Sequence, residues 1–572
     1  MFDPARPFVL LDDAASGTAR LFSGMAEALD VHAADGVAPA IARLAELGPW
    51  AGFIGFEAGH ALEPRLARLG VQPPTGQPLL WMGRFANEAP VDAAALLQPW
   101  AGAPTSIGAL APSITQDQHA DAVARLHALI ASGDIYQANL TFPAHVAVSG
   151  HPLSLYARLR AGSAAPYGAV VFTGSQWHLS FSPELFFRLE GRRLTARPMK
   201  GTAPRGRFAA EDEARADALA ADPKNRAENL MITDLIRNDL SRVADHVAVP
   251  SLFAVERYPT VLQMTSTVTA TARPGITAAA VLMALFPCGS VTGAPKIRSL
   301  EVLAEVEPAP RGVYCGAIGA ISASGDALFN VAIRTLSLDG SKARLGLGSG
   351  IVADSVAADE WAECLAKAAF LHRSGPPDLI ETIRVVAGTL PNLDGHMARL
   401  AASAAHLGHR LDQAAVRAAC VAAAAGQAGR LRLVLAPTGA WAIQCSPAPP
   451  PRPSPLRVKI VPLPVAPDDW RLCHKTSDRS FYDDARRAAG ADEVIFVRPD
   501  GQLTEGSFTS LFVARDGRLL TPPAALGLLP GVLRARLLAD GTAVEAPLTA
   551  ADLAGGFWLG NALRGLMPAR LG

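Results

Sequence analysis

A break about two thirds of the way along the chain limits what it can fold into. Residues 374–377, Ser-Gly-Pro-Pro, interrupt a long alternation of strand-like and helix-like segments, which then restarts. Adjacent Gly and Pro residues favour turns and linkers. The 572 residues are also too many for one hydrophobic core, because domains usually contain about 50–250 residues. We therefore predict two domains, over residues 1–373 and 378–572.

Both predicted domains show the mixed pattern of an α/β or α+β protein. Residues 114–142 predict a helix, a turn at 132–134 and a strand, because apolar residues recur at helical spacing before the turn. A long helical segment is predicted over 208–243. In the second domain, a proline-rich stretch at 446–455 divides the sequence again.

Charge and hydropathy exclude two kinds of partner. Lys+Arg and Asp+Glu both number 52, so the net charge favours neither nucleic acid nor an anionic membrane. The longest apolar stretches, such as 278–286, are far shorter than the ~20 residues of a membrane helix. The N-terminal residues lack a basic signal-peptide segment, and the six cysteines contain no CxxC pair, which indicates thiols and not a zinc site. We expect a cytoplasmic protein.

Three carboxylates of the first domain have the chemistry of magnesium ligands. Glu360 and Glu363 are three residues apart and Lys367 follows four residues later, so a helix places all three on one face. Glu228 begins another helical segment. Mg²⁺ prefers oxygen ligands and is often held by a few carboxylates together with groups of the substrate. The same spacing is usual on a solvent-exposed helix face, so it leaves both interpretations open.

A lysine in the segment RPMKGTAPRG (197–206) is a second candidate. Arg197 and Arg205 lie close to Lys200 in the sequence. Neighbouring positive charge lowers the pKa of a lysine and makes its amine a nucleophile or a base. The three cations equally suit binding of an acidic ligand or exposure to water.

Residues from about 115 to 372 resemble the chorismate-utilising enzymes. This family includes anthranilate, aminodeoxychorismate, isochorismate and salicylate synthases, and the resemblance implies a fold of two stacked β-sheets wrapped by helices. The lysine before Gly-Thr resembles aminodeoxychorismate synthases, whereas anthranilate synthases have alanine there. The matching blocks include SGDIYQANLTF (132–142), FSPELFF (181–187), RPMKGTAPRG (197–206), ENLMITDLIRNDLSRV (228–243) and GSGIVADS (348–355).

The resemblance implies roles for residues of these blocks. Lys200 attacks ring C2 of chorismate as the C4 hydroxyl leaves, Glu184 protonates that hydroxyl, and ammonia then adds at C4. The implied Mg²⁺ ligands are Glu228, Glu360 and Glu363. The positions implied to receive the two substrate carboxylates are Arg334, Lys367 and the backbone of Gly348, Ser349 and Gly350. The loop implied to line the ring pocket is Thr292, Gly293 and Ala294.

Two residues depart from the family pattern, and a glutaminase motif is absent from the sequence. Gln263 stands where the family commonly has histidine, so it cannot act as a base, and Cys288 stands where glycine is common. The sequence contains no glutaminase nucleophile motif. We therefore expect the ammonia to come from solution or from a separate glutamine amidotransferase subunit.

Two residues of the second domain have the types that pyridoxal 5'-phosphate (PLP) requires. The cofactor needs a lysine for attachment, an acid at its pyridine nitrogen and an anion cradle for its phosphate. Lys475 in HKTSDRSFYDDA (474–485) and Glu505 in GQLTEGSFTSLFV (501–513) supply the first two. An isolated lysine or glutamate is normally solvent-exposed, so these types alone do not identify the site.

As a set, the blocks of the second domain resemble the fold-type IV PLP enzymes. That family includes branched-chain and D-amino-acid aminotransferases and 4-amino-4-deoxychorismate lyase. Further matching blocks are LIETIRVVAGTLPNLDGHMARL (379–400) and LGLLPGVLRARLL (526–538). The resemblance implies a homodimer through this domain and a smaller α/β fold. It implies that Lys475 carries PLP, that Glu505 pairs with the pyridinium, that Thr382 assists, and that the phosphate is bound by Arg399, Thr509 and Ser510.

Together the two resemblances predict a bifunctional enzyme of folate biosynthesis. It would convert chorismate and ammonia to 4-amino-4-deoxychorismate, and then to 4-aminobenzoate and pyruvate. The lyase is preferred because the first product carries the amine that PLP would capture. In the alternatives, the first domain makes anthranilate or isochorismate, and the second is an aminotransferase or a non-catalytic module.

Overall fold

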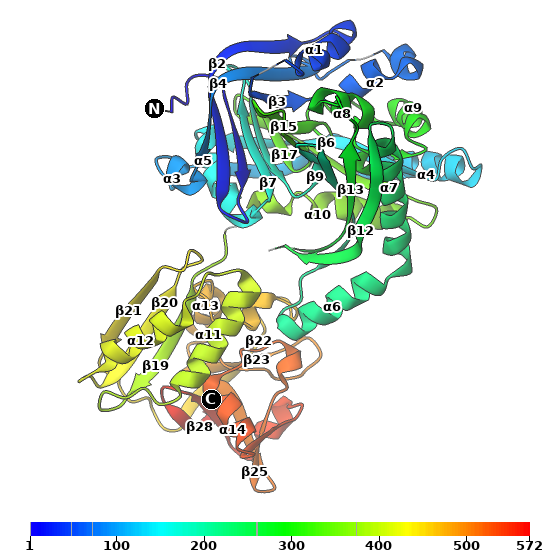
Figure 1. The fold of residues 1–572 in the computed structure, drawn as a ribbon. Coiled ribbons are helices and arrows are strands. Elements are labelled where there is room, and N and C mark those ends of the chain that lie inside the picture. Colours follow the sequence, from blue (N-terminus) through cyan, green and yellow to red (C-terminus); the bar gives the residue numbers. More distant parts are fainter. Residues whose placement is uncertain (1, 47, 71, 259–260, 373–374) are drawn as a thin grey trace. The chain divides into compact units, whose positions relative to one another are not determined.

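The computed structural model describes residues 2–46, 48–70, 72–258, 261–372 and 375–572, which form two compact units (Figure 1). Unit 1 contains Met1–Pro204 and Ala216–Gly375. Unit 2 contains Pro376–Gly572 and, in addition, the short segment Arg205–Arg215. The predicted linker at 374–377 begins at Ser374, which lies outside the described residues.

The strands of unit 1 form one antiparallel network of eighteen strands, folded into two layers. The central strand β2 (Thr18–Val31) pairs with β1 of the first layer and with β4 of the second. The first layer continues through β1 (Phe8–Asp13), β7 (Tyr167–Phe172), β8 (Trp177–Ser182), β17 (Thr335–Asp339), β18 (Lys342–Ile351) and β6 (Gln137–Ser149), with β5 (Ser106–Pro112) and β14 (Gly293–Ala294) beside β6. The second continues through β4 (Leu80–Val91), β3 (Trp50–Ile54), β15 (Ala317–Ile321), β16 (Ala327–Val331), β9 (Leu185–Glu190), β10 (Arg193–Arg197) and β13 (Val261–Ala272), with β11 (Met199–Pro204) and β12 (Ala244–Arg257) beside β13.

The alternation of side chains along each strand explains why the two layers stack. In β1, Val9 and Leu11 join a buried cluster with Phe53 of β3 and Ile318 of β15, so this cluster lies between the layers. The intervening Leu10 belongs to a different cluster, on the opposite face of the sheet. Successive side chains of a strand point to opposite faces, so each layer buries both faces. The predicted α/β class with stacked sheets is confirmed.

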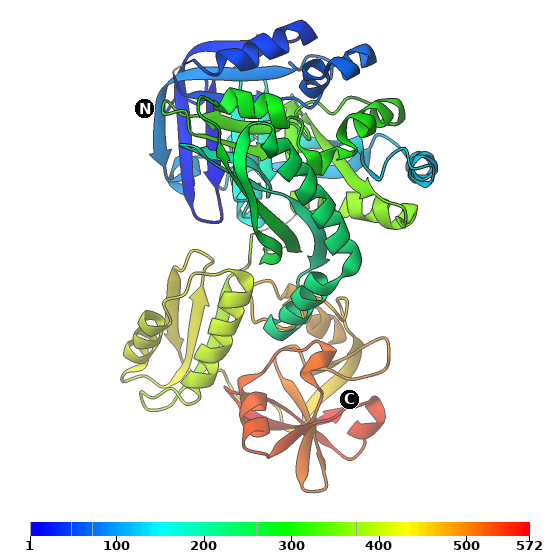
Figure 2. The ribbon, with the colours of Figure 1, turned by 45° about the vertical axis from the view of Figure 1, so that its right-hand side comes forward.

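Helices cover the two outer faces of unit 1 (Figures 1 and 2). Residues of α5 (Pro152–Ser163) and α10 (Ala357–Ala366) pack on the first layer, and residues of α1 (Val37–Arg43), α7 (Pro223–Ser241) and α8 (Ala278–Leu285) pack on the second. The other helices of the unit are α2 (Ala58–Leu62), α3 (Ala93–Leu97), α4 (Gln116–Ala131) and α9 (Lys296–Val306). The helix, turn and strand predicted over 114–142 are α4 and β6.

The helical segment predicted over 208–243 is confirmed, and it consists of two helices, α6 (Ala209–Ala221) and α7. Asp222 separates them in an extended conformation and accepts a hydrogen bond from the backbone N–H of Asn225 at 2.7 Å. Pro223 follows, and a proline lacks the N–H that would continue a helix but suits its first position. The apolar spacing alone does not show this break, which is produced by the cap of Asp222 at the start of α7.

Unit 2 contains two sheets separated by the proline-rich stretch 446–455, as predicted. The first is antiparallel and contains β19 (Leu379–Val385), β20 (Gly429–Leu435) and β21 (Trp441–Ser446), covered by α11 (Leu393–Leu407) and α12 (Gln413–Ala424). The second has the order β23 (Glu493–Val497), β22 (Leu456–Pro462), β28 (Gly565–Leu571), β27 (Phe557–Asn561), β24 (Ser510–Arg515), β25 (Arg518–Thr521) and β26 (Ala543–Glu545). Two helices, α13 (Ser480–Ala489) and α14 (Val532–Ala539), complete the unit. Among all described residues, no helix has both the length and the apolar character needed to cross a membrane.

Candidate active sites

The amine of Lys200 lies in a cluster of charged side chains in unit 1. Burial lowers the pKa of Lys200 below its usual value, and the charge of Glu228 opposes this shift most strongly. The amine fills the space above Gly350, where a Cβ atom would lie 2.9 Å from Lys200 Nζ and 2.6 Å from Gln137 Nε2. A side chain at this position would displace the end of Gln137 or of Lys200. Gln137 is a site residue that the sequence analysis missed, because a neutral amide inside a matching block carries no distinguishing signal.

Glu184 is a buried carboxyl group between strands β8 and β9. Burial raises its pKa to about 7, against the hydrogen bond from Ser290 and the charge of Lys200. Its Oε1 atom is buried and has no hydrogen-bond partner among the described residues. A carboxyl group with this pKa is partly protonated at neutral pH and can donate a proton to a reacting group.

The three predicted magnesium ligands lie on two helices, α7 and α10. Burial raises the pKa of Glu228, and the negative charges of Glu360 and Glu363 add to this effect. Glu363 forms an ion pair with Lys367 (Oε1 to Nζ, 2.7 Å), and Glu360 accepts a hydrogen bond from Ser355 at 2.7 Å. In the part of the chain that the structure describes, no group of three acidic, His or Cys side chains is arranged to hold a metal alone. The oxygen donors nevertheless fit Mg²⁺, which is usually bound through one or two carboxylates, water and the substrate.

Strand β6 brings two of the predicted substrate-binding segments together. Gly348, Ser349 and Gly350 of β18 pair with Thr141, Leu140 and Asn139. Gly293 and Ala294 of β14 pair with the next residues of β6, Ala138 and Gln137, and the carbonyl of Thr292 accepts from the Asn139 N–H at 2.8 Å. Lys367 donates to the Gly348 carbonyl at 2.7 Å. The predicted residues thus surround the end of β6 that carries Gln137.

Arg334 has a backbone conformation that non-glycine residues rarely adopt. Its φ is +51°, and its carbonyl accepts a hydrogen bond from the N–H of Phe181 at 3.0 Å. Burial lowers the pKa of Arg334, and Tyr258 opposes that shift. Tyr258 also interacts with Glu184, so Arg334 belongs to the same electrostatic cluster. Such strained positions are concentrated at functional sites.

A cavity of about 450 Å³ lies in unit 2. It is lined by residues of both sheets and of α11, α13 and α14. The six residues predicted for the PLP site all line it: Thr382, Arg399, Lys475, Glu505, Thr509 and Ser510.

The two predicted PLP-contacting residues have strongly shifted pKa values. Burial lowers the pKa of Lys475 to about 7, and the charge of Arg399 lowers it further. Burial raises the pKa of Glu505 to about 7. The hydroxyl of Tyr482 donates to Glu505 Oε1 at 2.6 Å, and the N–H of Leu529 donates at 3.1 Å. A buried amine and a buried, oriented carboxyl group in one cavity fit PLP, which needs both. Tyr482 was missed because tyrosine in a helix usually packs in the core.

Arg399 is held in place by Glu381. Its Nε and Nη2 atoms donate to Glu381 Oε1 and Oε2 at 2.8 and 2.6 Å, and His396 Nδ1 lies 2.7 Å from Oε2. Burial opposes ionisation of Glu381, but the charges and hydrogen bonds of Arg399 and His396 together outweigh it and lower the pKa of Glu381 to about 2. A paired, oriented arginine of this kind suits a phosphate group that approaches its remaining N–H donors.

Five arginines at the cavity form no ion pair within the described ranges. They donate instead to neutral oxygens: Arg430 to Ser446, Arg432 to Thr382, and Arg452, Arg479 and Arg564 to the backbone carbonyls of Asp492, Ser507 and Pro450. Burial lowers the pKa of Arg564, and the charges of Arg452 and Arg430 contribute. Several unpaired guanidinium groups in one place favour binding of anionic groups. These arginines were not predicted from the sequence, because arginine is the common cation of this chain.

The pKa of Lys475 predicts how its reaction with PLP depends on pH. Only the neutral amine attacks an aldehyde, and a pKa lowered to about 7 makes the neutral form dominant above that pH. The rate of PLP attachment to the cofactor-free protein should therefore rise about tenfold per pH unit below pH 7 and level off above it. Stopped-flow absorbance checks this. A rate that keeps rising to about pH 10, as for an ordinary lysine, would contradict it.

Comparisons with known proteins agree with this division of sites. Residues 6–373 match the family model of chorismate binding enzymes, and residues 378–571 match that of amino-transferase class IV. The aminodeoxychorismate synthase component 1 of Bacillus subtilis (strain 168) is 38% identical over 273 residues, which are 47% of this chain and 58% of that protein. The anthranilate synthase component 1 of Methanothermobacter thermautotrophicus is 40% identical over 247 residues, which are 43% of this chain and 53% of that protein.

A crystal structure of anthranilate synthase component I from Streptococcus pneumoniae TIGR4 has a TM-score of 0.54 at 26% identity, covering 65% of this chain and 93% of that one. The chain spans less than two thirds of the length of the two curated relatives above. Because the first family model spans well over half of its residues, the chain belongs to the chorismate-binding enzyme family, continued in one polypeptide by an amino-transferase class IV region.

Proposed function

We propose that the chain converts chorismate and ammonia to 4-amino-4-deoxychorismate in unit 1, and this product to 4-aminobenzoate and pyruvate in unit 2. The observation that carries the proposal is the desolvated amine of Lys200, which interacts with the charges of Glu228 and Glu184. Lowering the pKa of an amine increases the fraction in the neutral, nucleophilic form at neutral pH. An enzyme that makes anthranilate does not need a nucleophilic lysine at this position.

In unit 1, the amine of Lys200 adds to ring C2 of chorismate. The ring double bonds shift, the C4–O bond breaks, and Glu184 donates the proton with which the hydroxyl leaves as water. Ammonia adds at C4, the double bonds shift back, and the C2–N bond to Lys200 breaks. The added nitrogen loses a proton to Glu184, which is then ready for the next turnover. General-acid assistance of this kind contributes about 10²–10⁴-fold.

In unit 2, the amine of 4-amino-4-deoxychorismate enters the cavity beside Lys475. Bound PLP supplies an electron sink at the substrate's C4. Lys475 removes the C4 proton, the C3–O bond breaks, and the ring becomes aromatic. Lys475 then returns a proton to the leaving enolpyruvate, which becomes pyruvate. Glu505, which is held by hydrogen bonds from Tyr482 and Leu529, would keep the pyridine nitrogen of the cofactor protonated.

The arginines of the cavity favour this substrate over an ordinary amino acid. 4-Amino-4-deoxychorismate carries two carboxylates, and an aliphatic amino acid carries one. The cluster of Arg430, Arg432, Arg452 and Arg564 provides more positive charge than one carboxylate neutralises. This supports the lyase over a general aminotransferase.

We further propose that Glu228, Glu360 and Glu363 hold Mg²⁺ against the ring carboxylate. Glu228→Ala should raise the Mg²⁺ concentration for half-maximal amination about tenfold or more, because one of few protein ligands is lost. Titration of the rate with Mg²⁺ checks this, with the exposed Glu305→Ala as the matched control. An unchanged Mg²⁺ dependence in Glu228→Ala would count against the ligand role.

The proposed partners follow from the names of the relatives and from the chemistry. Relatives named component 1 imply a second component, and we propose that a separate glutamine amidotransferase supplies ammonia. We also propose that unit 2 forms a homodimer.

One experiment tests the proposed function directly. Purified protein is incubated with chorismate, ammonium, Mg²⁺ and PLP, and the aromatic product is identified by mass spectrometry and chromatography. We expect 4-aminobenzoate and an equal amount of pyruvate. Anthranilate as the product would refute the assignment of unit 1, and 4-amino-4-deoxychorismate without 4-aminobenzoate would refute that of unit 2.

A further inference from the structure

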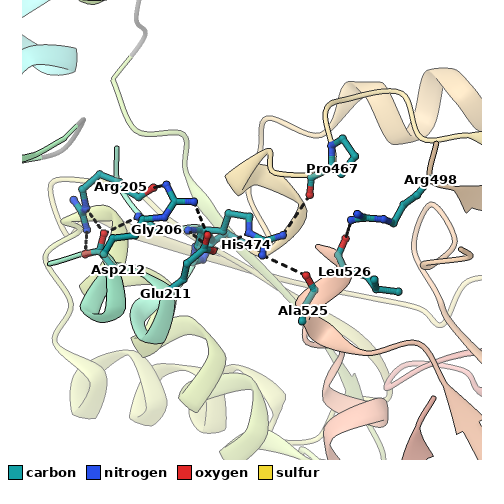
Figure 3. Close-up of polar contacts among 11 residues, drawn as sticks. Arg205, Gly206, Glu211, Asp212, Pro467, His474, Arg498, Ala525 and Leu526 are labelled. Atoms are coloured by element: carbon teal, nitrogen blue, oxygen red, sulfur yellow. Dashed lines mark hydrogen bonds and ion pairs between the residues drawn. The ribbon is translucent and has the colours of Figure 1, made fainter. Parts of the chain in front are cut away.

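A segment of eleven residues belongs to unit 2 although it lies within the sequence range of the first family match. Residues 205–215, called the clamp segment below, begin five positions after Lys200. Their polar contacts with the rest of unit 2 involve residues on both sides of Lys475 in the sequence (Figure 3). A family match to residues 378–571 alone does not include them.

The start of the clamp segment has a shape of its own, fixed by the contacts of Asp212. Asp212 accepts from Arg205 Nε and from the backbone N–H of Gly206, both at 2.8 Å (Figure 3). Glu211 accepts from Arg207 Nε at 2.7 Å and also from Arg215. A Cβ atom at Gly206 would lie 2.1 Å from the backbone nitrogen of Asp212. The start of α6 is therefore folded tightly against residues 205–207.

The backbone of the clamp segment orients the ring of His474, the residue before Lys475. His474 Nε2 lies 2.9 Å from the carbonyl oxygen of Arg207, and Nδ1 lies 2.9 Å from Ser403 Oγ. A carbonyl only accepts, so Nε2 carries the hydrogen. Burial lowers the pKa of His474 to about 4, so the ring is neutral and Nδ1 accepts from the serine hydroxyl. Both ring nitrogens are thereby satisfied, and one of them depends on Arg207.

The side chain of Arg207 holds the loop that reaches Glu505. Its Nη1 and Nη2 atoms donate to the carbonyls of Pro467 and Ala525 at 3.4 and 3.3 Å (Figure 3). There is no room for another side chain here, because a Cβ at Gly527 would lie 3.2 Å from Arg207 Nη1 and 2.5 Å from the Pro467 carbonyl. Two residues further on, the N–H of Leu529 donates to Glu505 Oε1.

We propose that the clamp segment is a positioning element of the PLP site. The backbone carbonyl of Arg207 fixes Lys475 through His474. The side chain of Arg207 fixes Glu505 through the loop 525–529. The C-terminal active site is therefore built from two separate parts of the sequence, 205–215 and 376–572. This inference rests on PLP binding by unit 2, which is part of the proposed function, and not on the lyase step.

The first test compares two arginines of the clamp segment in the full-length protein with PLP. Arg207→Ala removes the hydrogen bonds to Pro467 and Ala525 as well as the ion pair with Glu211. Arg215→Ala also removes an ion pair with Glu211, but otherwise only a bond to the carbonyl of Arg205. We expect Arg207→Ala to raise the Kd of PLP about tenfold and to shift the pH midpoint of the cofactor absorbance band, because hydrogen bonds from a charged donor are lost. Arg215→Ala should change neither by more than about twofold.

A second pair of variants separates positioning from folding. His474→Gln keeps an N–H donor for the Arg207 carbonyl, whereas His474→Leu has none. We expect the glutamine variant to keep the PLP affinity of the wild type and the pH midpoint of its cofactor absorbance band. In the leucine variant the PLP affinity should fall and the pH midpoint should shift. If Arg207→Ala does not fold, the two His474 variants alone test whether the clamp segment positions the PLP site.

Each outcome has a distinct meaning. Equal PLP affinity and equal midpoints in Arg207→Ala and Arg215→Ala, or in the two His474 variants, would overturn the positioning role. A wild-type protein that forms no cofactor band with PLP would instead refute the cofactor assignment of unit 2.

Discussion

Lys200→Ala is expected to abolish conversion of chorismate to 4-aminobenzoate. The variant removes the nucleophile that we propose attacks the ring, so the rate should fall by about three orders of magnitude or more, as when other covalent nucleophiles are removed. Any remaining turnover of chorismate should give a different product. The measurement is product analysis with saturating ammonium, Mg²⁺ and PLP, and the PLP absorbance band of unit 2 should be unchanged.

Lys342→Ala is the matched control for this prediction. Lys342 is an exposed lysine at the start of β18 in the same unit, so its loss tests the general effect of removing a lysine. It should retain full activity. Undiminished formation of 4-aminobenzoate by Lys200→Ala would show that amination proceeds without a covalent bond to this residue.

Lys475→Ala is expected to stop the second step and leave the first intact. Without the amine, PLP has no point of attachment and the C4 proton has no base. The variant should lose the long-wavelength band of the bound cofactor and accumulate 4-amino-4-deoxychorismate from chorismate. We expect 4-aminobenzoate to fall by about three orders of magnitude. Absorbance and product analysis by mass spectrometry check both effects in one sample.

The exposed Lys459, whose amine donates to the carbonyl of Ala489, is the control for the second variant. Lys459→Ala should keep the band and the product. If Lys475→Ala still formed 4-aminobenzoate at the normal rate, unit 2 would not be the lyase. A normal band in that variant would mean that another residue carries the cofactor.

Local patterns were sufficient to predict the elements around the sites. The helix, turn and strand at 114–142 followed from apolar spacing and from turn residues, both of which act over a few positions. The division of the second domain at 446–455 followed from proline content. The helical segment predicted over 208–243 is confirmed, but the apolar spacing does not show its division at Asp222, whose side chain accepts a hydrogen bond from the Asn225 N–H.

The residues of the candidate sites were only partly predictable from the sequence. Lys200 and Lys475 stand out in a chain with few lysines, and each lies in a distinctive block. Gln137 and Tyr482 do not stand out, because amides and tyrosines are common in strands and helices. Their importance depends on which charged group lies beside them, and that neighbour comes from a distant part of the chain.

By itself, the sequence determined the fold class, the stacked sheets and the residue types available for two reactions, because periodicity and matching blocks are properties of short segments. Only the tertiary structure decided the electrostatic environment of those residues. Desolvation lowers the pKa of Lys475 and raises that of Glu184, and desolvation depends on all the atoms packed around a group. Tertiary contacts also assigned residues 205–215 to unit 2, which no local pattern indicates, because membership of a folded unit depends on partners more than 150 residues away in the sequence.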